Sequence, residues 1–187
     1  ESLTLDLKQP AALAILMQLL GKVDVLVQNL APGAAARMGL GFADLKATNP
    51  ALIVCDISGY GDNGPYRDKK AYDLLIQSEA GFLSVTGTPD EPSKSGNSIA
   101  DIAAGMYAYT SILAALLQRD KRGGTGQGEH IDVSMLESML SLTLNELQWS
   151  QFEVKPTQRP MFGPIETTDG YVMVAIASEK TFQSLMK

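Results

Sequence analysis

Two short apolar runs, separated by helical patterns, limit most strongly what this chain can fold into. Asp24–Asn29 and Leu52–Ile57 have the length and composition of strands buried on both faces. The helices predicted around them are Gln9–Leu20, with Pro10 in its first turn, Ala34–Met38 and Phe42–Lys46. Strands that alternate with helices predict an α/β fold with a doubly wound, Rossmann-like parallel sheet.

Ligands of such sheets bind outside the carboxyl ends of the strands. In this chain those ends are the loops Asn29–Gly33 and Ser58–Gly61. We therefore expect the binding site to be built by these two loops.

The rest of the chain adds a strand and three longer helices. Leu3–Leu7 alternates like a strand, and helices are predicted at Tyr72–Gly81, Ala100–Gln118 and Val133–Phe152. Ala100–Gln118 lacks charge between Asp101 and its end, but it is shorter than a bilayer requires. A buried core helix is the favoured interpretation, and no membrane is expected as a partner.

A second, smaller domain is predicted near the end of the chain. Residues 1–153 form the large domain, and residues 154–164, which contain three prolines, form a linker. Residues 165–187 begin the small domain, with an Asp169-Gly170 turn before the strand Tyr171–Ala177. Both ends of the sequence look cut, so we expect a fragment of a longer protein.

Charge and composition exclude several classes of partner. The 187 residues include 21 acids and 15 bases, giving a net charge of −6, which argues against nucleic acid. Cys55, the single cysteine, lies in an apolar run and is expected to pack as a small core residue. His130 is expected to be exposed or on a sheet edge, and no metal-ligand spacing is present. A cytoplasmic enzyme fits these features best.

Asp101 is the carboxylate of most interest, and the pattern around it supports two interpretations. Ser98 and Asp101 have the spacing of a capping box at the start of a helix. Equally, a helix N-terminus favours an anion, and a carboxylate held near apolar walls can attack an activated carbonyl. Composition and spacing do not separate the structural interpretation from the catalytic one.

Several stretches together resemble a known family. They are Asp24–Gly33, Arg37-Met38-Gly39, Asn49–Ile53, Ser58–Gly61, Gly64-Pro65-Tyr66, Ala71–Asp73 with Gln77 and Gly81, Ala100–Leu117, Thr125–Gly128 and Val133-Ser134-Met135. In this order and spacing the chain is similar to the family III CoA-transferases, which include formyl-CoA transferase and carnitine CoA-transferase. The α-methylacyl-CoA racemases are relatives of that family.

The resemblance implies an activity and a set of site residues. Asp101 falls on the family's catalytic aspartate, and Tyr72 lies where it could assist or merely pack. The positions that match the family's coenzyme A contacts are Leu5, Lys8, Asn29, Leu30, Ala34, Arg37, Met38 and Lys70. Taken alone, bases such as Arg37 and Lys70 are more often solvated surface residues; the resemblance favours phosphate binding.

The implied substrates are acyl-CoA and small carboxylic acids, and the implied assembly is an interlocked homodimer. Where the racemase branch has a histidine, this chain has Tyr72, so one of two proton-exchanging groups is missing and transfer is favoured. A racemase or isomerase and a non-catalytic CoA-binding fragment remain alternatives. The sequence does not identify the donor and acceptor acids.

Overall fold

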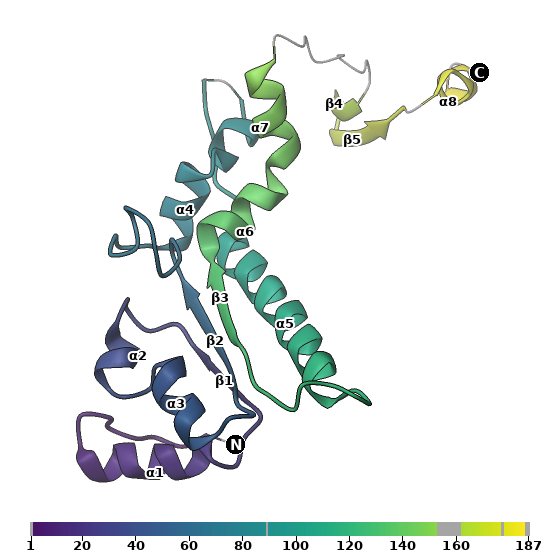
Figure 1. The fold of residues 1–187 in the computed structure, drawn as a ribbon. Helices are drawn as coiled ribbons and strands as arrows, with labels where there is room; N and C mark the ends of the chain where they lie inside the picture. The colour runs from purple at the N-terminus through teal and green to yellow at the C-terminus, as the bar shows by residue number, and fades with distance from the viewer. Residues whose placement is uncertain (1, 89, 153–161, 177, 186–187) are drawn as a thin grey trace. The chain divides into compact units, whose positions relative to one another are not determined.

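The computed structural model describes residues 2–88, 90–152, 162–176 and 178–185 (Figure 1). The chain divides into two compact units, Glu1–Gln148 and Trp149–Lys187, and each is described by itself.

The first unit is built on a parallel three-stranded sheet. Its strands are β1 (Val25–Gln28), β2 (Ile53–Ser58) and β3 (His130–Ser134), in the order β1-β2-β3. Both neighbouring pairs are parallel, with Val25 opposite Ile53 and Asp56 opposite Asp132. Because the strands are parallel, all three carboxyl ends lie at one edge of the sheet.

Helices cover both faces of this sheet (Figure 1). On one face lie α1 (Pro10–Leu20), α2 (Ala34–Arg37) and α3 (Phe42–Thr48). Buried residues of these helices pack with Val54 of β2 in one core cluster. The next residue, Cys55, points the other way and packs against Ala104 and Ala108 of α5 (Ile99–Asp120). The predicted doubly wound parallel sheet is confirmed.

A third cluster joins the helices beyond the carboxyl ends of the strands. It contains Ile76 and Ala80 from the region of α4 (Asp73–Glu79), Ala100 and Ala103 of α5, and Met139 of α6 (Met135–Leu142). Tyr60, from the loop after β2, packs against the same cluster. A short 3₁₀ helix, η1 (Phe82–Val85), follows α4. The beginning of α5 therefore lies beside the loop that leaves β2.

The expectation of a fully buried α5 is only half right. Its alanine face packs on β2 and β3, but Ile102, Met106, Leu113 and Leu117 form an exposed row on another side of the helix. Among the described residues, α5 is the one helix long and apolar enough to cross a membrane, a test that core helices also pass.

The predicted strand Leu3–Leu7 is wrong. The segment has no regular structure before a turn in which the Gln9 N–H donates to the Asp6 carbonyl over 2.9 Å. Alternation alone does not make a strand, because the backbone groups need a neighbouring strand to pair with. In the described sheet β1 is an edge strand, and this segment does not pair with it.

The single long helix predicted at Val133–Phe152 is also wrong. Its first two residues complete β3, and the remainder is divided into α6 and α7 (Leu144–Gln151). Between them Thr143 is buried, and its hydroxyl donates to the carbonyls of Ala80 and Met139 over 3.3 Å each. Threonine binds backbone carbonyls readily, which favours a break at this position.

The second unit contains a hairpin and a helix. Strands β4 (Phe162–Thr167) and β5 (Gly170–Ala175) pair antiparallel, and α8 (Glu179–Leu185) follows. The turn lies at Asp169, as expected, and the Thr167 hydroxyl donates to the Asp169 carboxylate over 3.1 Å. Residues 154–161 of the predicted linker lie outside the described residues, and residues 162–164 belong to β4.

Candidate active site

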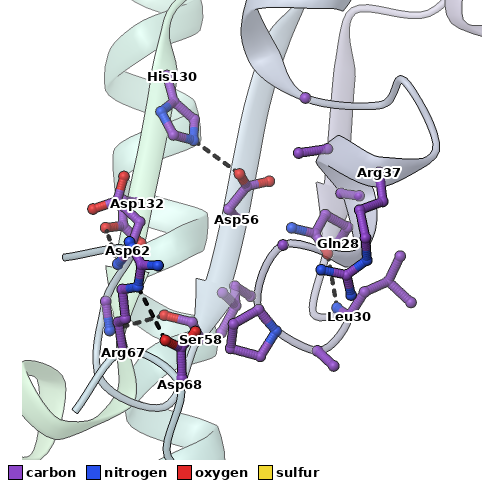
Figure 2. Close-up of a pocket in the computed structure, with 18 residues that line it drawn as sticks. Gln28, Leu30, Arg37, Asp56, Ser58, Asp62, Arg67, Asp68, His130 and Asp132 are labelled. Atoms are coloured by element: carbon purple, nitrogen blue, oxygen red, sulfur yellow. Dashed lines mark hydrogen bonds and ion pairs between the residues drawn. The ribbon is translucent and has the colours of Figure 1, made fainter. Parts of the chain in front are cut away.

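A cavity of about 350 Å³ lies at the carboxyl ends of β1 and β2 and extends along β2 and β3 as far as His130, the first residue of β3 (Figure 2). Its lining comes from the loop between β1 and α2, from the loop after β2, and from the polar side chains of β2 and β3. This is the position predicted from the sheet topology, and the volume is at the lower end of the usual range for small-molecule sites.

One wall of the cavity is formed by the loop that leads into α2. The Leu30 N–H donates to Oε1 of Gln28 over 2.7 Å, which fixes the start of this loop. Gly33 has φ +73°, and a β-carbon there would lie 2.8 Å from Nη1 of Arg37. Glycine at position 33 therefore leaves room for the Arg37 guanidinium to lie along the loop and into the cavity.

The opposite wall is rich in carboxylates, as Figure 2 shows. Nε2 of His130 lies 2.9 Å from Oδ2 of Asp56, and the Asp62 N–H donates to Oδ2 of Asp132 over 3.1 Å. Nε of Arg67 lies 3.2 Å from Oδ2 of Asp68. This wall can accept hydrogen bonds from a ligand, whereas the Arg37 wall can bind an anion.

Two of these carboxylates are unusual for an apolar sheet. Burial raises the pKa of the Asp132 carboxyl, and the hydrogen bond from the Asp62 N–H only partly opposes that effect. Oδ1 of Asp56 is buried and has no hydrogen-bond partner in the described part of the chain. An unsatisfied buried acceptor favours a ligand that donates a hydroxyl or amine hydrogen there.

Asp101 lies in the first turn of α5, close to the same edge of the sheet. Its carboxylate is exposed, and no hydrogen bond to it forms among the residues that the structure describes. Burial of part of the side chain raises the pKa of the Asp101 carboxyl, and the negative charge of Asp73 raises it further. Asp101 is exposed to solvent but does not line the cavity itself.

The capping-box interpretation of Asp101 is wrong. Ser98 is the N-cap residue of α5, but its side chain makes no capping hydrogen bond. The backbone N–H of Ala100 is bound instead by Oδ1 of Asp73, over 2.8 Å. Asp73 thus takes the place of the Ser98 side chain as the cap of α5, and the Asp101 carboxylate accepts no hydrogen bond from the Ser98 N–H in the described residues.

The structure brings two of the predicted coenzyme A contacts together in the cavity, Leu30 and Arg37. Asn29 is exposed just before them, and Ala34 is half-buried at the start of α2. Met38 packs against the core between β2 and the helices α1 to α3.

The remaining predicted residues lie outside the cavity. Leu5 and Lys8 precede α1, the first half-buried and the second exposed. Lys70 and Tyr72 lie on the segment that leads into α4, and Tyr72 is 70% exposed. Tyr72 and Asp101 are the sequence neighbours of Asp73 and Ala100, whose side chain and backbone are joined by the hydrogen bond described above.

Sequence reasoning missed the acidic wall. Asp56 and Asp132 each stand inside an otherwise apolar strand, and His130 opens the second of these strands. A polar residue within a buried strand is a signal for a site, and it was available in the sequence. His130 lies on β3, an edge strand, as expected.

A parallel sheet covered on both faces, with a polar cavity at its carboxyl edge, is the arrangement in which α/β proteins bind small ligands. The model of CoA-transferase family III matches residues 1–187, and the chain belongs to this family.

Known relatives agree with this assignment. The chain is 34% identical to the succinate–glutarate CoA-transferase of Agrobacterium fabrum, over 98% of this chain and 48% of that protein. It is 29% identical to the human succinyl-CoA:glutarate CoA-transferase, over 100% of this chain and 44% of that protein. The acetyl-CoA:oxalate CoA-transferase of Acetobacter aceti is 32% identical, over 99% of this chain and 49% of that protein.

The fold is also shared with a solved structure. A CAIB/BAIF family protein from Brucella suis superimposes with a TM-score of 0.86 at 32% identity, covering 99% of this chain and 50% of that one. The chain spans about half the length of the relatives it matches.

Proposed function

We propose that the protein containing this chain transfers coenzyme A between carboxylic acids, with Asp101 as the nucleophile. The observation that carries the proposal is the exposed Asp101 carboxylate, unbound at the start of α5 and beside the carboxyl edge of a family III fold. A carboxylate whose pKa is raised is more basic once ionised, and basicity favours nucleophilic attack.

The transfer takes place in balanced steps. An oxygen of the Asp101 carboxylate attacks the thioester carbonyl of the donor. A C–O bond forms and the C–S bond breaks. CoA departs as the thiolate, and the donor acyl group is now joined to Asp101 as a mixed anhydride. The thiolate then attacks the Asp101 carbonyl, giving an aspartyl-CoA thioester and releasing the donor as a free carboxylate. An acceptor carboxylate reverses both steps and restores the Asp101 carboxylate. No net proton is consumed.

Arg37 is the residue of the cavity best suited to the phosphates of coenzyme A, since its guanidinium can bind two phosphate oxygens at once. Asp56, with its unpartnered oxygen, suits a hydroxyl or amine of the nucleotide. We propose that Leu30, beside Arg37, makes an apolar contact with coenzyme A. We propose that Lys70 and Lys8, which lie outside the cavity, interact with its phosphates through their charge. Among the described residues, no cluster of three or more His, Cys, Asp or Glu side chains is arranged to hold a metal ion.

Short dicarboxylates are the acceptors to test first, because relatives of this chain are named for succinate, glutarate and oxalate. We also propose a homodimer for the full-length protein. The exposed apolar row on α5 supports an interface of some kind. Light scattering on the full-length protein measures its mass, and a monomer at micromolar concentration contradicts the dimer.

The full-length protein with Asp101→Ala tests the function. We expect succinyl-CoA:glutarate transfer to be abolished while the protein remains folded by circular dichroism. In the parent protein, incubation with succinyl-CoA alone should give a CoA adduct on the peptide that contains Asp101, detected by mass spectrometry and removed by hydroxylamine. Full transfer activity in Asp101→Ala would exclude Asp101 as the nucleophile. Exchange of Cα hydrogen in deuterated water without an acceptor would instead favour a racemase.

A further inference from the structure

The first turn of α5 is attached to α4 by a chain of three hydrogen bonds. The Ala100 N–H donates to Oδ1 of Asp73 over 2.8 Å. Nε2 of Gln77 donates to Oδ2 of the same carboxylate over 2.6 Å, and the Ser95 N–H donates to Oε1 of Gln77 over 2.9 Å. Asp73 and Gln77 of α4 therefore bind the backbone on both sides of Ser98, the residue that precedes α5.

The direction of these hydrogen bonds is fixed by chemistry. Both ends of the chain are backbone N–H groups, of Ala100 and Ser95, and each needs an acceptor. The Asp73 carboxylate accepts from Ala100, and the Gln77 amide oxygen accepts from Ser95. The NH₂ group of Gln77 then donates to the second oxygen of Asp73. An asparagine at position 73 has one oxygen and one NH₂ group. If its oxygen accepts from the Ala100 N–H, its NH₂ group faces the NH₂ group of Gln77; in the reverse orientation its NH₂ group faces the Ala100 N–H.

The residues that form these hydrogen bonds include buried ones. Gln77 is fully buried, as are its neighbour Ile76 and Ala100 at the other end. A buried amide that is satisfied on both sides holds its partner in one orientation, because rotation leaves a polar group unpaired. Asp101 follows Ala100 directly, so the position of its backbone is set by this chain of bonds.

We propose that Asp73, held by Gln77, is a positioning residue that fixes the turn carrying Asp101 and places a second negative charge beside that carboxylate. The inference rests on the proposed function, in which Asp101 is the nucleophile. Asp73 itself need not touch the substrate.

Electrostatics agrees with this role. Charged groups on the elements that pack against α5 are Asp73 and Glu79 on α4, Asp56 on β2, His130 and Asp132 on β3, and Glu137 on α6. Of these, Asp73 is the group whose charge raises the pKa of the Asp101 carboxyl, in addition to the effect of burial. Removal of the Asp73 charge should therefore allow Asp101 to ionise at lower pH.

Two variants of the full-length protein separate charge from position. Asp73→Asn removes the charge and keeps an oxygen for the Ala100 N–H, but its NH₂ group then faces that of Gln77, so the position of its acid limb, and not its plateau rate, reports the charge. Gln77→Met keeps the charge and the approximate size but removes both hydrogen bonds of the amide. Glu137→Gln, on an exposed residue of α6, is the control for loss of one negative charge near α5. Circular dichroism and urea unfolding establish that each variant is folded.

The readout is the rate at which succinyl-CoA forms the adduct on Asp101, measured by mass spectrometry as a function of pH without an acceptor. For Asp73→Asn we expect the acid limb of this rate to move to lower pH. For Gln77→Met we expect the acid limb to stay in place while the plateau rate falls about tenfold, because a small displacement of a nucleophile is costly. Glu137→Gln should match the parent in both respects.

Either an unshifted acid limb in Asp73→Asn or a parental plateau rate in Gln77→Met overturns the inference. Should Asp73→Asn fail to fold, the parent protein at about 1 M salt gives a second measurement, since screening weakens the effect of Asp73 and should also move the limb to lower pH; an unmoved limb there has the same meaning. An absence of any Asp101 adduct in a parent protein that transfers CoA overturns the proposed function instead.

Discussion

The guanidinium of Arg119 donates from Nη2 to Oδ1 of Asp24 over 2.9 Å, although 95 residues separate them in sequence. The same side chain donates from Nη1 to the Ala51 carbonyl, also over 2.9 Å, and it is 9% exposed. Arg119 therefore ties the end of α5 to the Asp24 side chain just before β1 and to the Ala51 backbone just before β2. Hydrogen bonding to Asp120 and Asp24 raises the pKa of Arg119, so its charge is constant at any working pH.

Arg119→Met should destabilise the protein by about 2 kcal/mol, because the Ala51 carbonyl loses its donor in a partly buried position. Urea unfolding measures the loss. Arg122→Met is the matched control: Arg122 is exposed, and its replacement should change stability by less than about 0.5 kcal/mol. Equal stability of the two variants would show that Arg119 does not fix the end of α5.

Gly59→Ala should also destabilise the first unit, for a steric reason. A β-carbon on Gly59 would collide with the β-carbon of Ala71, where the loop after β2 passes the start of α4. We expect a loss of about 1–3 kcal/mol.

The double variant with Ala71→Gly tests this explanation, since it removes the colliding atom. It should recover most of the stability, and a coupling energy near zero in the double-mutant cycle contradicts the collision. Gly96→Ala is the control, because a β-carbon there meets no atom within 4 Å.

What the sequence predicted well was local. The strands at Val25–Gln28 and Ile53–Ser58 and the helix from Pro10 follow from short apolar patterns, and two successive buried residues of β2 place helices on both faces of the sheet. Alternation at Leu3–Leu7 was misleading because a strand also needs a partner, which no local pattern reveals.

The site depended on contacts distant in sequence. The spacing of Ser98 and Asp101 fits a local capping rule, yet Ser98 makes no capping hydrogen bond, and Asp73, 27 residues before Ala100, binds the first turn of α5 in its place. Asp56 and Asp132 lie opposite each other only because β2 and β3 pair in one register. Neither relationship follows from the sequence until the positions of the helices and strands are known.

Cys55 should be unreactive in the folded protein. It is fully buried, and burial raises the pKa of its thiol to about 11, with the negative charges of Asp56 and Asp132 adding to the effect. At pH 8 the thiol is thus protonated almost completely. We expect no reaction with Ellman's reagent in native buffer and one thiol per chain in urea. Rapid, complete labelling without denaturant would contradict this packing of β2 against α5.

Asp101→Asn should make the protein more stable at pH 7.5, although it removes the proposed nucleophile. Burial and the charge of Asp73 raise the pKa of Asp101 in the folded state, so ionisation at this carboxyl opposes folding. Folding therefore favours the protonated form: the stabilising contribution is present below the unfolded pKa, about 4, and is lost as the pH rises through the higher folded value. The neutral amide in the Asp101→Asn variant cannot ionise, so it avoids that loss of stability.

Urea unfolding should show a higher free energy of unfolding for Asp101→Asn at pH 7.5, and a smaller gain as the pH falls toward 4. Asp90→Asn, at an exposed position, is the control and should leave the free energy of unfolding unchanged. A loss of stability at pH 7.5 would mean that the Asp101 carboxylate stabilises the start of α5, which favours a structural role over a catalytic one.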